Sequence, residues 1–555
     1  MAPAGPLLDR AHRHSEVKAK GAAPVALLSI LALLSILVLA ATLRLWAIGS
    51  VPGNTFYDAA VRSMDHSWHD FFFGALEPGG SLAVDKPPVD LWLEVGSTQI
   101  LGFNLTALHL PEALAGVTTS ILLFATLRRP FGVATALLSA LLMAVLPAAV
   151  LTARSDTMDS VLAALCVAAL WCSWLALESR RVRWILLAAL LMGVAFNVKL
   201  TEALLPLPAL ALLWWWASPR EPRARIFTLA GTGALLVAVS LSWAAIASLT
   251  PLSHRPFPVG SRTGSIWRLE FLYNGLERLG SKAPGAPSAR AGDAPGLLRL
   301  LHAGASQNEA RIGLAALAAV LLGLLAATLA ARHRPRGTLS PPARLAVAIV
   351  VWLVCGLILF STISHLQGRY LEILAPAICA ALGISIGSLL ARRRIALTLA
   401  IGAITLALLS VQLATDVDLI HTKRSDSVLQ DPISAAMGRY LRAHRGGAHY
   451  ELASPAVFDV TGLVARDGLP VLVLNDVDGS LVRNGTLRSL VRTEQLHFYF
   501  ASHGCHSGHH CPVDERWAYL HSKPVIGYPG LRRFEVTEQP VRTARVHLTR
   551  GQSYS

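Results

Sequence analysis

The chain has 555 residues, of which 53% are hydrophobic and only 15% are charged, and its mean hydropathy is +0.50. Soluble proteins carry about 25% charged residues, so this composition excludes a purely water-soluble protein. The net charge of +15 raises the question of nucleic acid, but the arginines separate apolar segments and form no basic face, so we exclude nucleic acid as a partner.

Apolar segments of membrane-spanning length recur from the N-terminus to about residue 414. The first segment, 22–48, is longer than the apolar core of a signal peptide, so we expect it to remain as an uncleaved first span. With the later segments it predicts about eleven spans. The later segments lie near 109–127, 131–152, 160–178, 184–198, 203–216, 227–249, 312–331, 343–364, 371–391 and 395–414.

Every second loop is rich in arginine, which indicates how the spans are oriented. These residues are Arg128 and Arg129, Arg180, Arg181 and Arg183, Arg220, Arg223 and Arg225, Arg332, Arg334, Arg336 and Arg344, and Arg392, Arg393 and Arg394. Because basic loops stay in the cytoplasm, these loops and the N-terminal tail, 1–21, are predicted to be cytoplasmic. A plasma-membrane domain, 22–414, then has two long external loops, 49–108 and 250–310.

The first external loop, 49–108, holds aromatic residues and charges of both signs, and long ordered loops of this kind often carry function. Tyr57, Val61, Met64 and Trp68 recur at helical spacing. The spacing predicts an amphipathic helix over 56–73 that lies on the membrane surface, with Asp58 on its polar side. Its aromatic residues suit either a sugar face or lipid headgroups.

The sequence AVDKPP at 83–88 places a carboxylate beside a cation and ends in two prolines. Proline fixes its own backbone and keeps the preceding residue extended. Asp85 and Lys86 are therefore expected on a stiff segment at the mouth of the helix bundle.

A second external cluster, ARSDTMDS, occupies 153–160 between two spans. Asp156 and Asp159 are three residues apart, so they share one face once the helix begins. Helix capping and an ion pair with Arg154 explain the cluster without any function. The cluster and the Asp85-Lys86 pair are predicted to meet at the same external mouth of the helix bundle, and this favours a functional site. The two aspartates are also able to hold Mg²⁺ or Mn²⁺ weakly.

Further polar residues are predicted near the same mouth of the helix bundle. Lys199 lies between two short apolar segments, and Arg369 follows a later span with His365 and Tyr370 beside it. The planar guanidinium of Arg369 suits a phosphate group, and the neighbouring side chains suit hydrogen bonding to it. Snorkelling of the lysine and interfacial anchoring of the others are the alternatives.

The region 415–555 changes to shorter apolar runs and predicts a small external α/β domain. Strands are expected at 470–475 and 496–501, and helices at 432–446 and 480–494. The region has no nucleotide-binding motif. Within HGCHSGHHCP, 503–512, Cys505 and Cys511 are candidates for a disulfide, and the histidines between them leave a zinc site as the alternative.

These motifs, in this order, resemble the membrane glycosyltransferases of the C-type fold, in particular glycosyltransferase family 39 with its protein mannosyltransferases and aminoarabinose transferases. The matching pieces are Asp85-Lys86-Pro87-Pro88, Arg154 with Asp159, and Lys199. The chain is most similar to a bacterial subgroup with a soluble C-terminal domain, in which AAVRSM, VDKPP, YNG and a tyrosine before an LAPA-like run follow one another. The resemblance implies an all-α polytopic membrane domain with about eleven spans and a small external α/β domain.

The resemblance also implies an activity: transfer of a sugar, with inversion, from a polyprenyl-phosphate carrier to an external acceptor such as a protein hydroxyl, a cell-wall glycan or a lipid. Lys86, Arg369 and Lys199 would neutralise the phosphate, and Tyr57, Arg154, Asp156, His365 and Tyr370 would complete the binding site. Asp159 would orient Lys86 or the acceptor. No nucleotide or other cofactor is expected.

One departure from the family concerns the general base, a carboxylate that must take the acceptor proton. The family carries an Asp-Glu pair just before the tyrosine, where this chain has Gly53 and Asn54. Asp58, Asp85 and Asp159 remain as candidates. A lipid or solute transporter and a decayed transferase that only binds are the alternative functions. A transporter would show broken helices at matching positions in two halves, and the sequence shows none.

Overall fold

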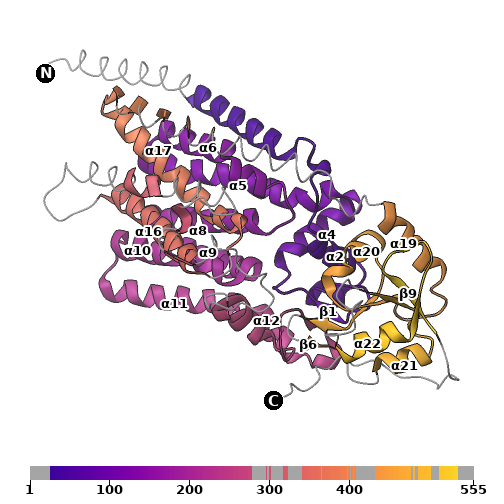
Figure 1. The fold of residues 1–555 in the computed structure, drawn as a ribbon. Coiled ribbons are helices and arrows are strands. Elements are labelled where there is room, and N and C mark those ends of the chain that lie inside the picture. The colour runs from indigo at the N-terminus through magenta and orange to yellow at the C-terminus, as the bar shows by residue number, and fades with distance from the viewer. Residues whose placement is uncertain are drawn as a thin grey trace, which may run out of the picture.

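The structure is a computed structural model that describes residues 26–277, 340–363, 366–396, 432–476, 486–501 and 512–535, with short pieces at 295–296, 299–301, 317–322, 398–399, 402–403, 406–407, 410 and 479–481. A bundle of long helices carries an α/β domain at one end (Figure 1). The N-terminal half of loop 49–108, the first of the two loops predicted to be external, lies between the two parts.

Seven helices in the described part of the chain are long and apolar enough to cross a membrane. They are Ala26–Ser50, α5 (Leu105–Phe131), α8 (Asp159–Ser179), Val182–Leu204 (α9, Val182–Lys199, with η2, Leu200–Leu204), α11 (Pro222–Ser240), α16 (Pro341–Thr362), and Gly368–Ala391 (η6, Gly368–Leu374, with α17, Ala375–Ala391). Two shorter apolar helices are α6 (Val133–Val145) and α10 (Leu207–Ala217). The chain is therefore a mostly helical membrane protein.

Some of the predicted spans differ from the structure or lie outside the described residues. The segment predicted at 131–152 is interrupted, because α6 ends before Pro147 and a separate helix, α7 (Pro147–Thr152), begins there. Proline favours the first position of a helix, where its missing N–H costs nothing. The segments predicted at 312–331 and 395–414 lie largely outside the described residues.

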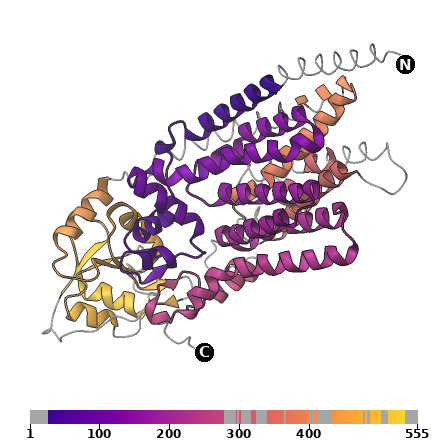
Figure 2. The same ribbon diagram turned by 180° about the vertical axis from the view of Figure 1, so that it is seen from behind.

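Two helices form the edges of the bundle, and one lies in its centre. The first helix and α11 are mostly exposed, and Figure 2 shows them on opposite sides of the bundle. Helix α17 is buried and packs against α6. A side chain at Gly383 or Gly387 would collide with Ser139 or Thr135 of α6, so these glycines allow the close approach of the two helices.

The first external loop forms α2 (Thr55–Met64), α3 (Trp68–Phe73), β1 (Leu82–Ala83) and α4 (Val89–Leu101). The prediction of one surface helix over 56–73 is wrong in two respects. The helix breaks after Met64, and Ser67 caps the start of α3 by accepting from the backbone of Asp70. Helix α2 is also buried on both sides, because α4 and a helix of the C-terminal domain pack against it.

After α11 the chain forms α12 (Ser242–Leu249), η3 (Leu252–His254) and β2 (Phe257–Pro258), the last two within the loop predicted over 250–310. It continues through α13 (Ile266–Arg268) into a π-helix, η4 (Leu269–Leu276). Strand β2 pairs in parallel with β1. The two external loops are thus joined by main-chain hydrogen bonds just before the Asp85-Lys86 segment.

The C-terminal domain has a five-stranded mixed sheet in the order β4-β3-β7-β9-β8, in which β3 pairs in parallel with β4 and β7 while β9 runs antiparallel to β7 and β8. Helices surround this sheet, as the sequence predicted. The strands are β3 (Leu452–Ser454), β4 (Val471–Val473), β7 (Phe498–Phe500), β8 (Ser522–Pro524) and β9 (Leu531–Phe534), with a separate pair β5 (Asn475–Asp476) and β6 (Gly479–Ser480). The helices are α19 (Pro432–Ala443), η8 (Val457–Asp459), α20 (Thr461–Asp467), α21 (Thr486–Arg492) and α22 (Val513–Leu520).

Candidate active site

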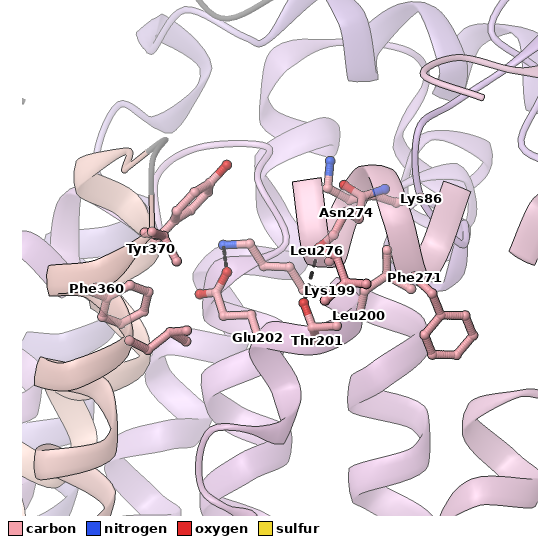
Figure 3. A pocket seen from close by; sticks show the side chains of 13 residues that line it. Lys86, Lys199, Leu200, Thr201, Glu202, Phe271, Asn274, Leu276, Phe360 and Tyr370 are labelled. Atoms are coloured by element: carbon pink, nitrogen blue, oxygen red, sulfur yellow. Dashed lines mark hydrogen bonds and ion pairs between the residues drawn. The ribbon is translucent and has the colours of Figure 1, made fainter. Parts of the chain in front are cut away.

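A cavity of about 410 Å³ opens where η2, η4, α16 and η6 meet. Most of its wall is apolar, and two lysines reach it, Lys86 from the segment before α4 and Lys199 from the end of α9 (Figure 3). The lining residues are Lys86, Lys199, Leu200, Thr201, Glu202, Phe271, Asn274, Gly275, Leu276, Leu359, Phe360, Ile363 and Tyr370. An apolar pocket with a few convergent charged groups is the usual form of a site for an amphipathic ligand.

Lys86 reaches the cavity beside the carboxylate that precedes it. Its Nζ atom lies 2.7 Å and 2.8 Å from the two carboxylate oxygens of Asp85 and donates to the hydroxyl of Tyr57 at 3.0 Å. The amide of Asn274 on η4 donates to the main-chain carbonyl of Asp85 at 2.6 Å. The structure therefore brings together Tyr57, Asp85 and Lys86, which the sequence placed in the site, with Asn274 of the YNG motif, to which the sequence assigned no role.

Lys199 forms the second charged group of the cavity. It pairs with Asp159 at the start of α8 and, at 2.9 Å, with Glu202 on η2. Its Nζ atom also lies 4.2 Å from the centre of the Tyr370 ring. The expectation that Asp159 orients Lys86 is wrong in this structure, because Asp159 is bound to Lys199.

Arg369 lies next to this second cluster. Its guanidinium is 5.7 Å from the centre of the Tyr370 ring, and it is within electrostatic range of Asp159 and Asp156. Two cationic groups from different elements, Lys199 and Arg369, thus meet around one tyrosine. Such a pair provides positive charge for an anion that enters from the cavity.

Asp58 lies elsewhere, at the base of α2. It is fully buried, and its carboxyl group faces that of Asp156. Burial, and next the negative charge of Asp156, raise the pKa of Asp58 well above its ordinary value. A side chain at Gly53 would collide with the Asp58 carboxyl, so the glycine that departs from the family pattern leaves the space which this group fills.

The remaining predicted site residues lie apart from the cavity or outside the described chain. Arg154 donates to the main-chain carbonyls of Leu43 and Trp46 at 3.0 Å and 2.8 Å, so it caps the end of the first helix. His365, Cys505 and Cys511 are outside the described residues.

Sequence reasoning missed a group of buried carboxyls behind the cavity. They are Asp90 and Glu94 on α4, Glu112 on α5 and Glu372 on η6, all almost fully buried. Burial raises the pKa of Asp90 to about 7 and that of Glu94 well above its ordinary value. Ser160 links two of them, since its N–H donates to Glu112 and its hydroxyl to Glu372, at 2.7 Å and 2.8 Å. Acidic residues in otherwise apolar helices are the signal that would have found them.

The described residues contain no group of three or more His, Cys, Asp or Glu side chains arranged to hold a metal ion. Asp156 and Asp159, the pair considered for Mg²⁺ or Mn²⁺, have other partners. Asp156 accepts from the backbone N–H of Asn54 at 2.5 Å, and Asp159 binds Lys199.

Comparisons with known proteins show which family and which relatives this chain resembles. Residues 85–243 match the family described as dolichyl-phosphate-mannose-protein mannosyltransferase. Two relatives from Bacillus subtilis (strain 168) carry the names "Putative mannosyltransferase YycA" and "Putative mannosyltransferase YkcB". The first is 38% identical over 46% of this chain and 37% of its own length, and the second 36% identical over 43% and 34%. The chain thus matches little more than a third of the length of these curated relatives.

Solved structures show the fold. ArnT from Cupriavidus metallidurans in the apo state aligns with a TM-score of 0.57 and 15% identity over 87% of this chain and 93% of its own. The Archaeoglobus fulgidus oligosaccharyltransferase, in complex with Zn and sulfate, aligns with a TM-score of 0.53 and 13% identity over 84% and 67%.

The fold is therefore that of a polytopic membrane protein similar to these two solved structures. Over residues 85–243 the chain is similar to the mannosyltransferase family, which agrees with the resemblance of its motifs.

Proposed function

We propose that this protein is an inverting glycosyltransferase that moves a sugar from a polyprenyl-phosphate carrier to a hydroxyl acceptor outside the cytoplasm. The observation that carries the proposal is the composition of the cavity. Its apolar wall, which includes Phe271, Leu276 and Phe360, suits an isoprenoid chain, and Lys86 and Lys199 provide the charge that a phosphate needs.

In the proposed reaction the acceptor oxygen attacks the anomeric carbon and the bond from that carbon to the phosphate oxygen breaks. The departing polyprenyl phosphate carries the negative charge, which Lys86, Lys199 and Arg369 stabilise. The acceptor proton passes to a carboxylate. A single displacement of this kind inverts the configuration of the sugar, and it requires neither a nucleotide nor a metal ion.

Among the three candidate bases, Asp85 has the best position. Its side chain is 13% exposed, whereas those of Asp58 and Asp159 are buried. Asp85 also stands directly before Lys86, so the proton acceptor and a phosphate-binding cation occupy consecutive residues of one stiff segment. We therefore assign Asp85 as the general base and Asp159 to the positioning of Lys199.

We further propose that the cavity end of the bundle and the C-terminal domain face the outside of the plasma membrane. The arginine-rich turns between α5 and α6 and between α10 and α11 support this orientation. In Figure 1 the α10–α11 turn lies at the end of the bundle opposite the C-terminal domain. The acceptor, whether a protein hydroxyl, a cell-wall glycan or a lipid, would approach between this domain and the cavity.

The test is release of free polyprenyl phosphate from radiolabelled polyprenyl-phosphate sugars by protein in nanodiscs, with a cell-envelope extract as the source of acceptor. We expect release with one donor, dependent on the extract and lost in Asp85→Asn. Folded wild-type protein that releases nothing from any donor would contradict the proposal and favour transport or binding. Loss in Asp58→Asn with no loss in Asp85→Asn would move the base to Asp58.

A further inference from the structure

The start of α2 is held by two carboxyl groups from distant parts of the chain. Asp156, in the turn before α8, accepts from the backbone N–H of Asn54, the residue that caps α2. The carboxyl of Asp58, in the first turn of α2, faces Asp156 and packs against Gly53. Both aspartates are almost fully buried, with exposed fractions of 0% and 1%.

This arrangement needs a proton. Two ionised carboxylates only accept hydrogen bonds, and neither carboxyl oxygen of Asp58 receives one from a donor. Two further buried carboxyl groups of α4, Glu94 and Asp90, lie close by, while Arg369 and His109 face the pair only from the Asp156 side. A buried carboxylate with no donor and a like charge beside it is strongly destabilised, and one shared proton turns the repulsion into a hydrogen bond.

We propose that Asp58 and Asp156 share one proton and so fasten the start of α2 to the turn that precedes α8. The two aspartates are positioning residues, since neither lines the cavity. This inference rests on the proposed function and concerns the geometry of the same site.

The two elements that the carboxyl pair joins, α2 and the turn before α8, each position a partner of one cavity lysine. Tyr57, the residue before Asp58, accepts from Lys86, and Asp159, three residues after Asp156, binds Lys199. The carboxyl pair therefore sets the separation of the two cations that meet the phosphate. A displacement of about 1 Å between catalytic groups is able to reduce the rate about a hundredfold.

The pair gives the site a defined dependence on pH. Because the pKa of Asp58 is raised in the folded protein, its stabilising contact is present at low pH and is lost as the pH rises through that raised pKa. At higher pH the pair loses the shared proton, repulsion separates the two side chains, and α2 loses its anchor.

The test compares Asp58→Asn, Asp58→Ala and the wild type in nanodiscs from about pH 5 to about pH 9. Asparagine has nearly the shape of aspartic acid and donates an N–H to Asp156 at every pH. Asp65→Asn, at the exposed end of the same helix, is the matched control for charge. The readouts are polyprenyl phosphate release and hydrogen–deuterium exchange of the peptide that covers 54–64.

We expect Asp58→Ala to lose turnover by about 10- to 100-fold, and Asp58→Asn to keep most of it. The hydrogen–deuterium exchange of 54–64 in the wild type, divided by that in Asp58→Asn at the same pH, should rise with pH. Turnover of the wild type should fall at alkaline pH, and turnover of Asp58→Asn should not show this fall. Asp65→Asn should follow the wild type in both readouts.

Two results would overturn the inference. One is equal loss of turnover in Asp58→Asn and Asp58→Ala with unchanged exchange, which would make Asp58 the base. The other is a rate of exchange in 54–64 that is the same in the wild type and in Asp58→Asn at every pH. A wild type that releases no polyprenyl phosphate would contradict the proposed function instead, and the exchange measurement would still decide whether the proton is shared.

Discussion

The two lysines of the cavity are held in different ways, and their substitution should have different effects. Lys86 lies beside Asp85 and Tyr57 and stands on a segment that ends in two prolines. Lys199 lies between two acidic side chains, Asp159 and Glu202, and is 5% exposed. Both cations line the cavity, and Lys199 in addition joins α8 to η2 through its two carboxylate partners.

Replacing Lys86 by alanine should reduce turnover by about 10²-fold or more, because the charge acts on the leaving phosphate. The measurement is the turnover number at saturating donor, with the unfolding midpoint in detergent beside it. Lys523→Ala, an exposed lysine of the C-terminal domain, is the control. Turnover of Lys86→Ala near that of the wild type would show that the phosphate does not bind there.

Replacing Lys199 by methionine should lower stability, because two acidic groups then lose their shared cation. Breaking a buried ion pair by removing one partner costs about 3–5 kcal/mol. The unfolding midpoint in detergent should fall, and the double variant Lys199→Met with Glu202→Gln should recover part of the loss. A midpoint unchanged in Lys199→Met would mean that the triad adds nothing to stability.

The sequence identified the charged residues at the mouth of the helix bundle but not which of them contact one another. Asp85 and Lys86 are neighbours in the chain, so their contact follows from the motif. The contact of Asp159 with Lys199 joins residues 40 positions apart, and that of Asp58 with Asp156 depends on where α2 meets the turn before α8. Such pairings follow from tertiary packing and have no local signal in the sequence.

At the scale of elements, the long apolar helices and the strands of the C-terminal domain were predictable from hydropathy and alternation. Strands β4 and β7 fall inside the predicted runs 470–475 and 496–501. Helix α2 was placed wrongly, because a helix with one apolar face fits a membrane surface and a domain interface equally well. Only its contact with α20 decides between the two.

The contact between α6 and α17 gives a prediction at this scale. Gly383→Val should lower the unfolding midpoint, because the new side chain meets both the side chain and the backbone of Ser139. Overpacking of this kind costs about 1–3 kcal/mol. Gly231→Val on α11 is the matched control, since no atom lies within 4 Å of a side chain there. Equal midpoints for the two variants would contradict the close packing of α17 on α6.

In the whole molecule, the C-terminal domain packs directly on the first external loop. Phe458 stacks on Phe56 with ring centres 5.4 Å apart, and the hydroxyls of Thr55 and Thr461 are 3.1 Å apart. Farther along the loop, Glu77 accepts a backbone hydrogen bond from Val471 of β4. The domain thus supports the loop that carries Tyr57, Asp85 and Lys86.

A charge placed in this interface should separate the domain from the loop. Val460 is buried and faces Leu76 and Leu82 of the loop, so Val460→Asp would bury a carboxylate without a partner. We expect faster proteolysis of the domain and lower turnover. Ile526→Asp, on an exposed turn of the same domain, should change neither. Normal turnover after the domain is released would mean that the loop keeps its shape alone.

The bond from Asn274 to the carbonyl of Asp85 has a consequence for lipid selectivity. Asn274 belongs to η4, and the same π-helix contributes Phe271 and Leu276 to the apolar wall. In the proposed reaction, a carrier that pushes against this wall also moves the main chain of the base. The position of Asp85 then depends on how fully the isoprenoid fills the cavity. A shortened carrier should therefore lower kcat as well as raise KM.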